Sequence, residues 1–461
     1  MGRTREHAVV IGASIAGLCA ARVLSDFYER ITVFDRDELP DTPANRTAVP
    51  QGRHVHILMA RGAQEFGALF PGLLDDMVAA GVPILENRPD CIHFGAAGHL
   101  LGTAHYLREE FTTYVPSRPQ LEWQIRRRVT DIDNVYIVRG AVIEPSYDSA
   151  RQQVTGVLLE SGDAVPADLV VDAAGRGTRL PVWLAQWGFE RPREDTVDVG
   201  IGYSTHQLRI PDGLLEEKVV VAGASLEQPL GLGMLYYEDG TWGLTTFGVA
   251  KVEPPRTFAQ MCDLADEILP AHLAAALRRG EPIGDVVFHK YPTSRWRRYD
   301  KLDRFPGGIL PFGDAVVSFN PTFGQGMTMT SLQAGHLRRA LQIPGADLAR
   351  EVNRATAKTT YPVWTMNAIG DLVLHRASGP MPWWYRPVGG LFDQFLGAAE
   401  TDPVLAEWFL RRFSLLDSLY MVPSARLVGR TIRHNMRLWL AERRPATRAA
   451  PVSAPRLKST W

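Results

Sequence analysis

Residues 308–330, GILPFGDAVVSFNPTFGQGMTMT, decide the fold. An apolar run ends at Gly313 and Asp314 follows at once; a loop with proline and glycine then leads into a helical pattern near Met327. Glycines allow the backbone to approach a bound ring closely, and a helix N-terminus directs its positive end at whatever the loop holds. The pattern is typical of a loop that cradles a flavin, with the short acid placed to hold the ribityl chain. The residues that we expect in this cradle are Gly313, Asp314, Pro321, Gly324, Gln325, Gly326 and Met327.

A second glycine turn, GASIAG at residues 12–17, follows a short apolar strand and opens a helix rich in Ala and Leu. It matches G-x-G-x-x-G with Ser14 in place of the second glycine. Gly12 permits the tight turn, Gly17 permits close packing of the helix on the sheet, and the helix N-terminus offers N–H groups to a pyrophosphate. Asp35 ends the next strand, where an acid binds a ribose hydroxyl. The dinucleotide-binding residues predicted here are Gly12, Ser14, Ile15, Ala16, Gly17, Asp35 and Arg36.

Length and composition indicate an ordinary globular protein with several packed units. The 461 residues exceed what one hydrophobic core usually organises. Lys and Arg total 50 and Asp and Glu total 51, a net charge of −1, so we expect no nucleic-acid partner. The three cysteines, Cys19, Cys91 and Cys262, have no CxxC spacing, and we expect neither a disulfide scaffold nor a metal site. Because no signal-peptide or membrane-spanning pattern is visible, a cytoplasmic location is expected.

The order of strand and helix patterns predicts an α/β fold with a Rossmann-like FAD-binding domain, an antiparallel-sheet substrate domain and a helical C-terminal segment. Between the two glycine-rich regions, strand-like runs are separated by glycine-containing turns, which favours an antiparallel sheet. We predict an FAD-binding domain in two parts, at residues 1–185 and 293–345, with the substrate domain between them at 186–292. The helical segment is predicted at 346–445 and a disordered tail at 446–461.

Three motifs in the same order resemble the FAD-dependent monooxygenases of the para-hydroxybenzoate hydroxylase type. They are GASIAG at 12–17, DAAGRGTR at 172–179 and GD…NPTFGQG at 313–326. Two further stretches are similar to the branch with squalene epoxidase and the bacterial polyether epoxidases: PQGRHVHIL at 50–58 and YPTSRWRRYDKL at 291–302. The resemblance covers roughly residues 7–345, and it implies a fold of the glutathione-reductase type around FAD.

The resemblance also assigns residues outside the two glycine loops. It implies that Arg53 lies near the FAD linker and that Arg118 contacts the adenosine side. In the middle motif, family hydroxylases carry Asp-Gly where this chain has Ala174 and Gly175, and that Asp takes part in handling both FAD and NAD(P)H. We therefore expect NADPH or NADH to reduce FAD either directly or through a separate flavin reductase. Nearby Arg176 and Arg179 would meet a phosphate or cap the strand exit.

The resemblance implies that a flavin C4a-hydroperoxide, formed from reduced FAD and O2, inserts one oxygen atom into the substrate. No convincing base is visible in the second domain, and epoxidation needs none. We therefore expect epoxidation of an alkene in an apolar polyketide or terpenoid natural product. The alternatives are an aromatic or polyketide hydroxylase, a flavin-dependent isoprenoid double-bond reductase and a non-enzymatic flavoprotein. The substrate-facing residues predicted here are Phe319, Asn320, Phe323, Tyr203 and His56.

Two further features carry alternatives of their own. His54 and His56 could form a metal pair, but no third ligand has convincing spacing, so they either run beside the flavin edge or hydrogen-bond at a helix start. Near the C-terminus, four arginines share one helix face with apolar neighbours. This basic helix either covers the core with a solvated face or contacts an anionic membrane or an acidic carrier protein. The arginines are Arg426, Arg430, Arg433 and Arg437.

Overall fold

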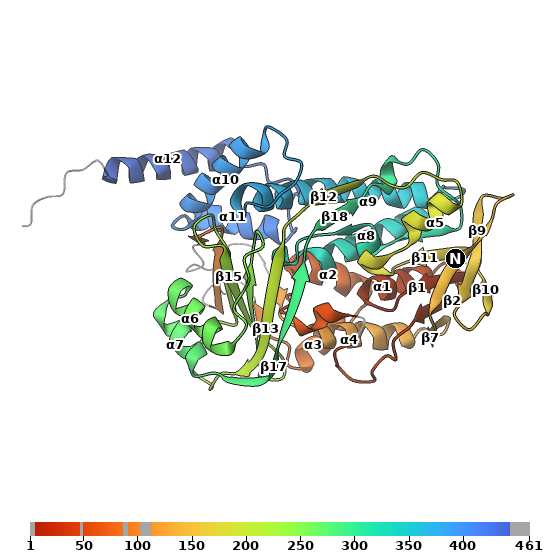
Figure 1. Cartoon of the computed structure of the whole chain (residues 1–461), viewed down its shortest axis with the longest axis horizontal. Helices are drawn as coiled ribbons and strands as arrows, with labels where there is room; N and C mark the ends of the chain where they lie inside the picture. Colours follow the sequence, from red (N-terminus) through yellow and green to blue (C-terminus); the bar gives the residue numbers. More distant parts are fainter. Residues whose placement is uncertain (1–4, 47–48, 86–90, 102–111, 443–461) are drawn as a thin grey trace, which may run out of the picture. The chain divides into compact units, whose positions relative to one another are not determined.

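The computed structural model of the protein describes residues 5–46, 49–85, 91–101 and 112–442 (Figure 1). The described residues up to Met421 form one unit, and those from Val422 onward form a second. The predicted tail at 446–461 lies outside the described residues, and the predicted domain boundaries stay predictions.

A five-stranded parallel sheet lies at the centre of the dinucleotide-binding part, in the order β19-β11-β1-β2-β7. Its strands are β1 (Arg5–Ile11), β2 (Tyr28–Asp35), β7 (Val135–Arg139), β11 (Leu169–Asp172) and β19 (Ile309–Pro311). Ile11 pairs with Asp172, and Asp172 pairs with Pro311, so the ends of three strands from distant parts of the sequence meet at one edge. Ligands bind at this carboxyl edge in open α/β sheets.

The two faces of this sheet are covered differently. Ala8 and Val10 of β1 pack into a core formed with helices, whereas Val9 faces a core on the opposite side. This alternation follows from the period of two along a strand. The helices on the first side are α1 (Ile15–Leu24), α2 (Ala60–Leu69), α3 (Leu73–Ala79), α4 (Arg118–Thr130) and α8 (Gly326–Leu341). On the second side lie β8 (Val142–Asp148), β9 (Gln153–Leu159), β10 (Ala164–Pro166) and α5 (Leu180–Gln186).

A seven-stranded sheet forms the second layer, in the order β17-β13-β16-β15-β14-β4-β5. The strands are β4 (Ile92–Ala96), β5 (His99–Leu100), β13 (Ile201–Arg209), β14 (Val219–Ala222), β15 (Leu230–Tyr236), β16 (Trp242–Gly248) and β17 (Glu281–Tyr291). Its pairings are antiparallel except that β14 pairs with β4 in parallel, so this sheet is mixed. Leu232, Met234 and Leu244 pack against α6 (Phe258–Ile268) and α7 (Ala271–Arg278), which leaves the alternate residues to the other face.

Helices follow the second glycine region. α9 (Leu348–Ile369) leads into a short π-helix, η7 (Gly370–Leu374), and then into α10 (Tyr385–Ala399) and α11 (Pro403–Phe413). Asp347 and Asp402 cap the starts of α9 and α11, because their carboxylates accept bonds from the first backbone N–H groups. The second unit contains α12 (Ala425–Glu442). Among the described residues, no helix is long and apolar enough to cross a bilayer.

Short elements complete the described structure. They are η1 (Pro50–Arg53), β3 (Ile84–Leu85), β6 (Thr113–Tyr114), η3 (Gly175–Gly177), β12 (Glu194–Val197), β18 (Ser294–Arg297), η4 (Tyr299–Lys301), η5 (Gly313–Ala315), β20 (Val317–Ser318) and η6 (Pro321–Phe323). The α/β class, with a parallel sheet, a second sheet and C-terminal helices, is therefore confirmed.

Candidate active site

A cavity of about 1120 Å³ opens at the carboxyl edge of the parallel sheet. Its lining comes from the two glycine turns, the inner face of the mixed sheet and helices α9 to α11. Sites for one small ligand usually measure about 300–1,000 Å³, so this cavity lies just above that range.

The first glycine turn is shaped by close backbone contacts. Gly12 has a φ of +101°, and a Cβ there would lie 2.8 Å from the carbonyl oxygen of Ala173. A Cβ on Gly17 would lie 1.8 Å from the carbonyl oxygen of Gly12. α1 then starts with no side-chain cap and no acidic residue in its first turn. Its first N–H groups are therefore placed to meet an anion at the cavity edge, where Ser14, Ile15 and Ala16 form the lining.

Asp35 closes β2 beside this turn and is held by a buried ion network. One of its carboxylate oxygens accepts the Ala13 N–H at 2.7 Å and pairs with Arg46 at 2.7 Å. Arg46 also pairs with Glu122 at 2.8 Å, and Arg118 lies 3.4 Å from the same Glu122 carboxylate. Burial works against the charged form of Arg46, but its two carboxylate partners raise its pKa. The network holds the Asp35 carboxylate in place at the sheet edge.

The second glycine region forms the opposite side of the dinucleotide path. Gly313 has a φ of +64°, a Cβ there would lie 2.6 Å from the Cβ of Ala16, and its N–H donates to Gln333 at 2.8 Å. Asp314 follows and lines the cavity, as do Gly324, with a φ of +66°, and Gly326. A Cβ on Gly326 would meet no atom of the described residues within 4 Å, so the start of α8 borders open space in this part of the structure.

The cradle loop, residues 315–325 between Asp314 and α8, is hydrogen-bonded to the C-terminal helices. The Asn320 side chain donates to Asp371 at 2.7 Å and accepts from the backbone N–H of Thr322 at 3.0 Å. Gln325 donates to the carbonyl oxygen of Phe413 at 3.1 Å and accepts from Asn367 at 3.1 Å. Asn320 is only 1% exposed, so its amide orders the loop instead of offering free donors to a substrate.

The middle motif meets the cavity between the two turns. Asp172 is fully buried, accepts the Ala174 N–H at 3.1 Å and is bonded to the Thr178 hydroxyl. Burial raises its pKa. The Arg176 guanidinium donates to Ser318 at 2.5 Å and to the Thr293 carbonyl oxygen at 2.9 Å. Arg176 therefore joins the middle motif to the cradle loop.

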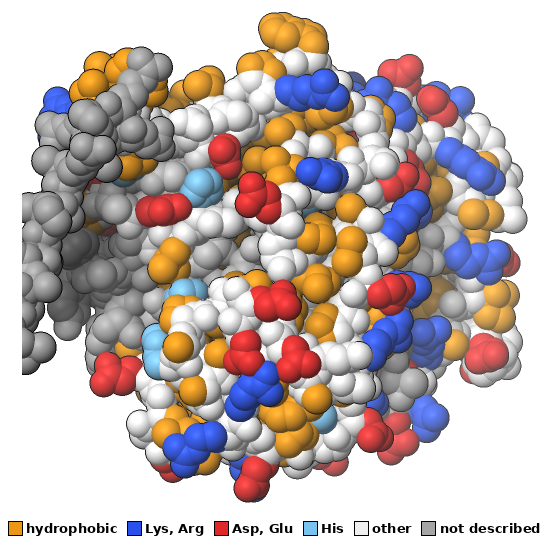
Figure 2. All heavy atoms as spheres, turned by 60° about the vertical axis from the view of Figure 1, so that its left-hand side comes forward, with side chains coloured by type: hydrophobic (Ala, Val, Ile, Leu, Met, Phe, Trp, Pro, Cys, Tyr) orange, Lys and Arg blue, Asp and Glu red, His pale blue; other side chains and the backbone are white. Residues whose placement is uncertain are grey.

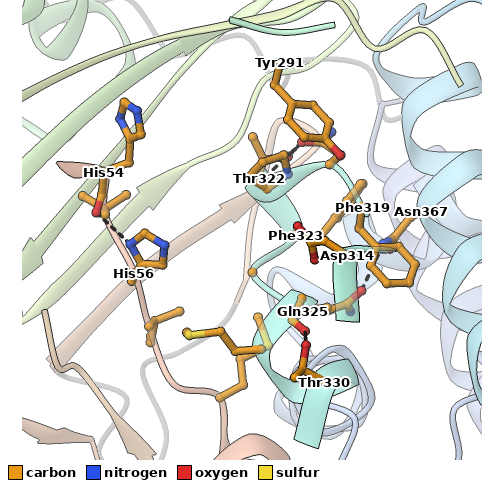
Figure 3. Close-up of a pocket in the computed structure, with 18 of the residues that line it drawn as sticks. His54, His56, Tyr291, Asp314, Phe319, Thr322, Phe323, Gln325, Thr330 and Asn367 are labelled. Carbon is orange, nitrogen blue, oxygen red and sulfur yellow. Dashed lines mark hydrogen bonds between the residues drawn. The ribbon is translucent and has the colours of Figure 1, made fainter. Parts of the chain in front are cut away.

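His54 and His56 line the other side of the cavity. Figure 3 shows them on one segment, across from Asp314, Phe323 and Gln325 on the cradle loop and its helix. The His54 Nδ1 atom bonds the Thr205 hydroxyl at 2.7 Å, and the His56 Nδ1 atom donates to the His54 carbonyl oxygen at 2.8 Å. Burial lowers the pKa of His54 to about 4 and that of His56 to about 3, so both rings are neutral near pH 7.

Nearly all of the site residues predicted from sequence lie around this one cavity. The lining includes Gly12, Ser14, Ile15, Ala16, Asp35, Arg36, His56, Arg118, Ala174, Gly175, Tyr203, Asp314, Phe319, Asn320, Pro321, Phe323, Gly324, Gln325, Gly326 and Met327. Gly17 and Gly313 are not part of the lining; they lie behind it, where they permit close packing. Arg53 is exposed at the end of η1 and is also not part of the lining, and its contact with the FAD linker stays a prediction.

Sequence reasoning missed several residues that shape the site. Arg46 and Glu122 complete the Asp35 network, and Asn367 and Asp371 hold the cradle loop. The one available signal was at residues 118–126, where Arg118, Glu122 and Arg126 recur at helical spacing. Among the described residues, no group of three or more His, Cys, Asp or Glu could hold a metal ion.

The cavity fits FAD. Two helices, α1 and α8, begin at its edge without side-chain caps and without acidic residues in their first turns. Their N-termini suit the pyrophosphate and an electron-rich ring, respectively. Asp35 and Asp314 lie on the lining where a ribose and a ribityl chain would offer hydroxyl groups. The open space beside Gly326 would admit a flat ring against the backbone.

The fold and this cavity suit a flavoprotein, and the chain is similar in sequence and in fold to FAD-dependent monooxygenases. PqsL of Pseudomonas aeruginosa, a probable FAD-dependent monooxygenase, aligns at a TM-score of 0.56 with 16% identity, covering 84% of this chain and all of that one. A kynurenine 3-monooxygenase of Salinispora arenicola is 26% identical over 349 residues, 71% of this chain and 70% of that protein.

A much more similar relative is protein Rv3254 of Mycobacterium tuberculosis, 69% identical over 470 residues that span 99% of each chain. The profile described as the Mycobacterium Rv3254 C-terminal domain matches residues 379–445. The chain belongs to the Rv3254 family.

Proposed function

We propose that the protein inserts one oxygen atom from O2 into an apolar substrate, and that the reaction is epoxidation of an alkene in a polyketide or terpenoid. This finer proposal places the chain near the epoxidase branch suggested by its sequence motifs. The observation that carries it is the composition of the cavity beyond the flavin cradle.

That part of the cavity is walled by apolar side chains from two layers. Phe94, Val219, Val221 and Leu235 come from the mixed sheet, and Phe392, Leu396, Phe409 and Phe413 come from α10 and α11. Phe94 and Phe413 form an aromatic seam between the mixed sheet and α11, with ring centroids 5.6 Å apart. Such walls favour a hydrocarbon over a charged substrate, since burying apolar surface stabilises the complex by about 25 cal/mol per Å².

FAD, when bound, supplies the redox chemistry and the activation of O2. The residues of this chain hold the cofactor and substrate in position and exclude water. The N-terminus of α8 and its backbone N–H groups favour negative charge beside Gly326. The Gln325 bonds to Asn367 and to the Phe413 backbone hold the start of that helix against α9 and α11. The aromatic seam excludes water from the reacting end of the substrate.

The histidines at the cavity support epoxidation because they are weak bases. With pKa values lowered to about 4 and about 3, His54 and His56 are poorly matched to removing a phenolic proton. Burial also raises the pKa of Tyr203 well above its ordinary value, so its hydroxyl stays protonated. Epoxidation asks for no proton removal from the substrate, and it is compatible with these neutral groups.

One observation favours an aromatic or polyketide hydroxylase as the second candidate. The hydroxyl of Tyr203 and the Nε2 atom of His54 are buried without a hydrogen-bond partner among the described residues, although both residues line the cavity. Their rings lie 5.7 Å apart. Buried polar atoms normally find partners, so a substrate hydroxyl or carbonyl could complete this pair.

The electron donor is proposed as NADPH or NADH, acting directly or through a separate flavin reductase. Ala174 offers no carboxylate at the position where the hydroxylases carry one. Arg176 is already engaged by Ser318 and the Thr293 carbonyl oxygen, and it lies 4.2 Å from the ring of Tyr291. These contacts use part of the hydrogen-bonding capacity of Arg176 and hold its guanidinium against the protein, which favours the separate reductase.

The test begins with the absorption spectrum of the purified protein and its FAD content after reconstitution. The reduced holoenzyme is then mixed with isotopically labelled O2 and, in separate reactions, with an apolar polyene or a polyketide phenol. We expect a labelled epoxide from the polyene. A labelled phenolic product alone would establish the hydroxylase, and saturation of the alkene without O2 would establish a reductase. A protein that takes up no FAD would overturn the proposal.

A further inference from the structure

The helix α12 carries an exposed apolar stripe. Its side chains repeat at helical spacing and are 41–59% exposed. They cover roughly a third of the circumference, the width expected of an apolar helix face. The stripe consists of Val428, Ile432, Met436, Trp439 and Leu440.

The least exposed positions described in α12 are Leu427 and Thr431, at 8% and 9% exposure. They lie on a different side of the helix from the stripe.

A row of arginines borders the stripe along one edge. The residues are separated by four, three and four positions, which aligns them along the helix. This row consists of Arg426, Arg430, Arg433 and Arg437. An apolar stripe with a tryptophan beside a basic row is the pattern of a helix that lies in the plane of a membrane interface.

The charge of the chain is strongly uneven. Residues 425–461 carry nine Lys or Arg against one Glu, whereas the whole chain has a net charge of −1. The first 424 residues therefore carry a net charge of −9. Figure 2 shows acidic and basic side chains interspersed over one face of the molecule. Such a concentration of positive charge at one end attracts an anionic surface.

We propose that α12 binds anionic lipid surfaces, with its apolar stripe in the interface and its arginine row on the lipid phosphates. An acidic protein would match the arginines but would leave an aliphatic and indole stripe in water. A nucleic acid would also leave the apolar stripe in water, since its backbone is polar. The helix does not meet the requirements of a membrane span, so it lies on the surface.

The test is flotation of the full-length protein with vesicles. We expect the protein to float with phosphatidylcholine vesicles that contain phosphatidylglycerol and to stay behind with phosphatidylcholine alone. The double variant Arg433→Glu/Arg437→Glu should bind the anionic vesicles at least about 25-fold more weakly, because each basic side chain contributes about a factor of five at such a surface. Ile432→Ser/Met436→Ser should also weaken binding, since it removes apolar contact while keeping the charge.

Matched controls separate this site from general charge effects. Arg209→Glu/Arg279→Glu makes the same change of charge at two exposed arginines outside α12 and should retain binding. Circular dichroism and FAD content check that each variant is folded. The proposal fails if the wild type ignores anionic vesicles, or if the apolar variant binds as well as the wild type. Equal loss in the control pair would also overturn it, as would binding of a polyglutamate peptide in preference to the vesicles.

Discussion

Asp314 lies on the cavity lining directly after Gly313, at the point where the two sequence-distant glycine turns come together. Replacing Asp314 with Ala removes a carboxylate that would accept a hydrogen bond from the ribityl chain of FAD. A hydrogen bond to a charged group is worth about 1.5–3 kcal/mol, so the Kd for FAD should rise by about 10- to 150-fold. Fluorescence titration of the apoprotein measures this, with exposed Asp303→Ala as the control. Unchanged retention of FAD in Asp314→Ala would show that the carboxylate does not touch the cofactor.

The lowered pKa of His54 predicts that the free energy of unfolding depends on pH. Its pKa is about 4 in the folded protein, compared with 6.5 for an ordinary histidine, because the ring is buried. Below about pH 6.5 the unfolded chain binds a proton at His54 that the folded protein does not bind, so stability falls until about pH 4. The loss from this residue amounts to at most about 3 kcal/mol.

Urea unfolding of the wild type and His54→Gln at about pH 7 and about pH 5 measures this contribution. The variant should lose less stability on acidification than the wild type. His272→Gln changes a histidine whose side chain is 59% exposed, and it should follow the wild type. An identical loss in wild type and His54→Gln would contradict a buried neutral ring.

At the scale of elements, two glycines in the first turns of α1 and α8 differ in what surrounds them. A Cβ at Gly17 meets the Gly12 backbone at 1.8 Å, whereas a Cβ at Gly326 meets no atom within 4 Å in the part of the chain that the structure describes. Gly17→Ala should therefore destabilise the fold by at least about 3 kcal/mol, through overpacking against backbone. Gly326→Leu should keep the unfolding free energy or raise it by up to about 1 kcal/mol, because glycine is a poor helix residue.

The same Gly326→Leu variant should bind FAD at least about tenfold more weakly, a loss of about 1.4 kcal/mol, because its side chain occupies the cradle. Denaturation curves and FAD titrations on both variants separate folding from cofactor binding. If Gly326→Leu took up FAD like the wild type, the ring would not approach the start of α8.

The elements that the sequence predicted well are those whose backbone conformation only a few residue types can adopt. Gly12 and Gly313 need positive φ, Asp35 is the last residue of β2, and Asp314 lies three residues after the end of β19, so local pattern was enough to find the two turns. β4 was missed because it pairs in parallel with β14, which lies far along the chain. Arg46 was missed for a similar reason: it lies in a loop without periodicity, and only the fold brings it to Asp35 and Glu122.

At the scale of the whole molecule, the cavity depends on three segments that are far apart in sequence. The cradle after β19, the inner face of the mixed sheet and helices α9 to α11 each supply one wall. Gln325 connects the first to the third, and the contact between Phe94 and Phe413 connects the second to the third. The C-terminal helices are therefore part of the site, so truncating a side chain of α11 that lines the cavity, with the backbone bond to Gln325 kept, should affect substrate binding and not FAD binding.

Phe413→Ala tests that conclusion, since the ring lines the cavity and lies 5.6 Å from Phe94 and 5.5 Å from Phe409. Truncation removes part of an apolar contact worth about 1.5–3 kcal/mol, so the KM for the apolar substrate should rise by about tenfold. Water admitted through the widened seam should also lower the amount of product formed per O2 consumed. The Kd for FAD should stay unchanged.

Phe305→Ala makes the same truncation at a half-buried ring outside the cavity lining, and it should keep the wild-type KM and coupling. Equal effects of the two truncations on KM would mean that α11 supports the fold without contacting the substrate.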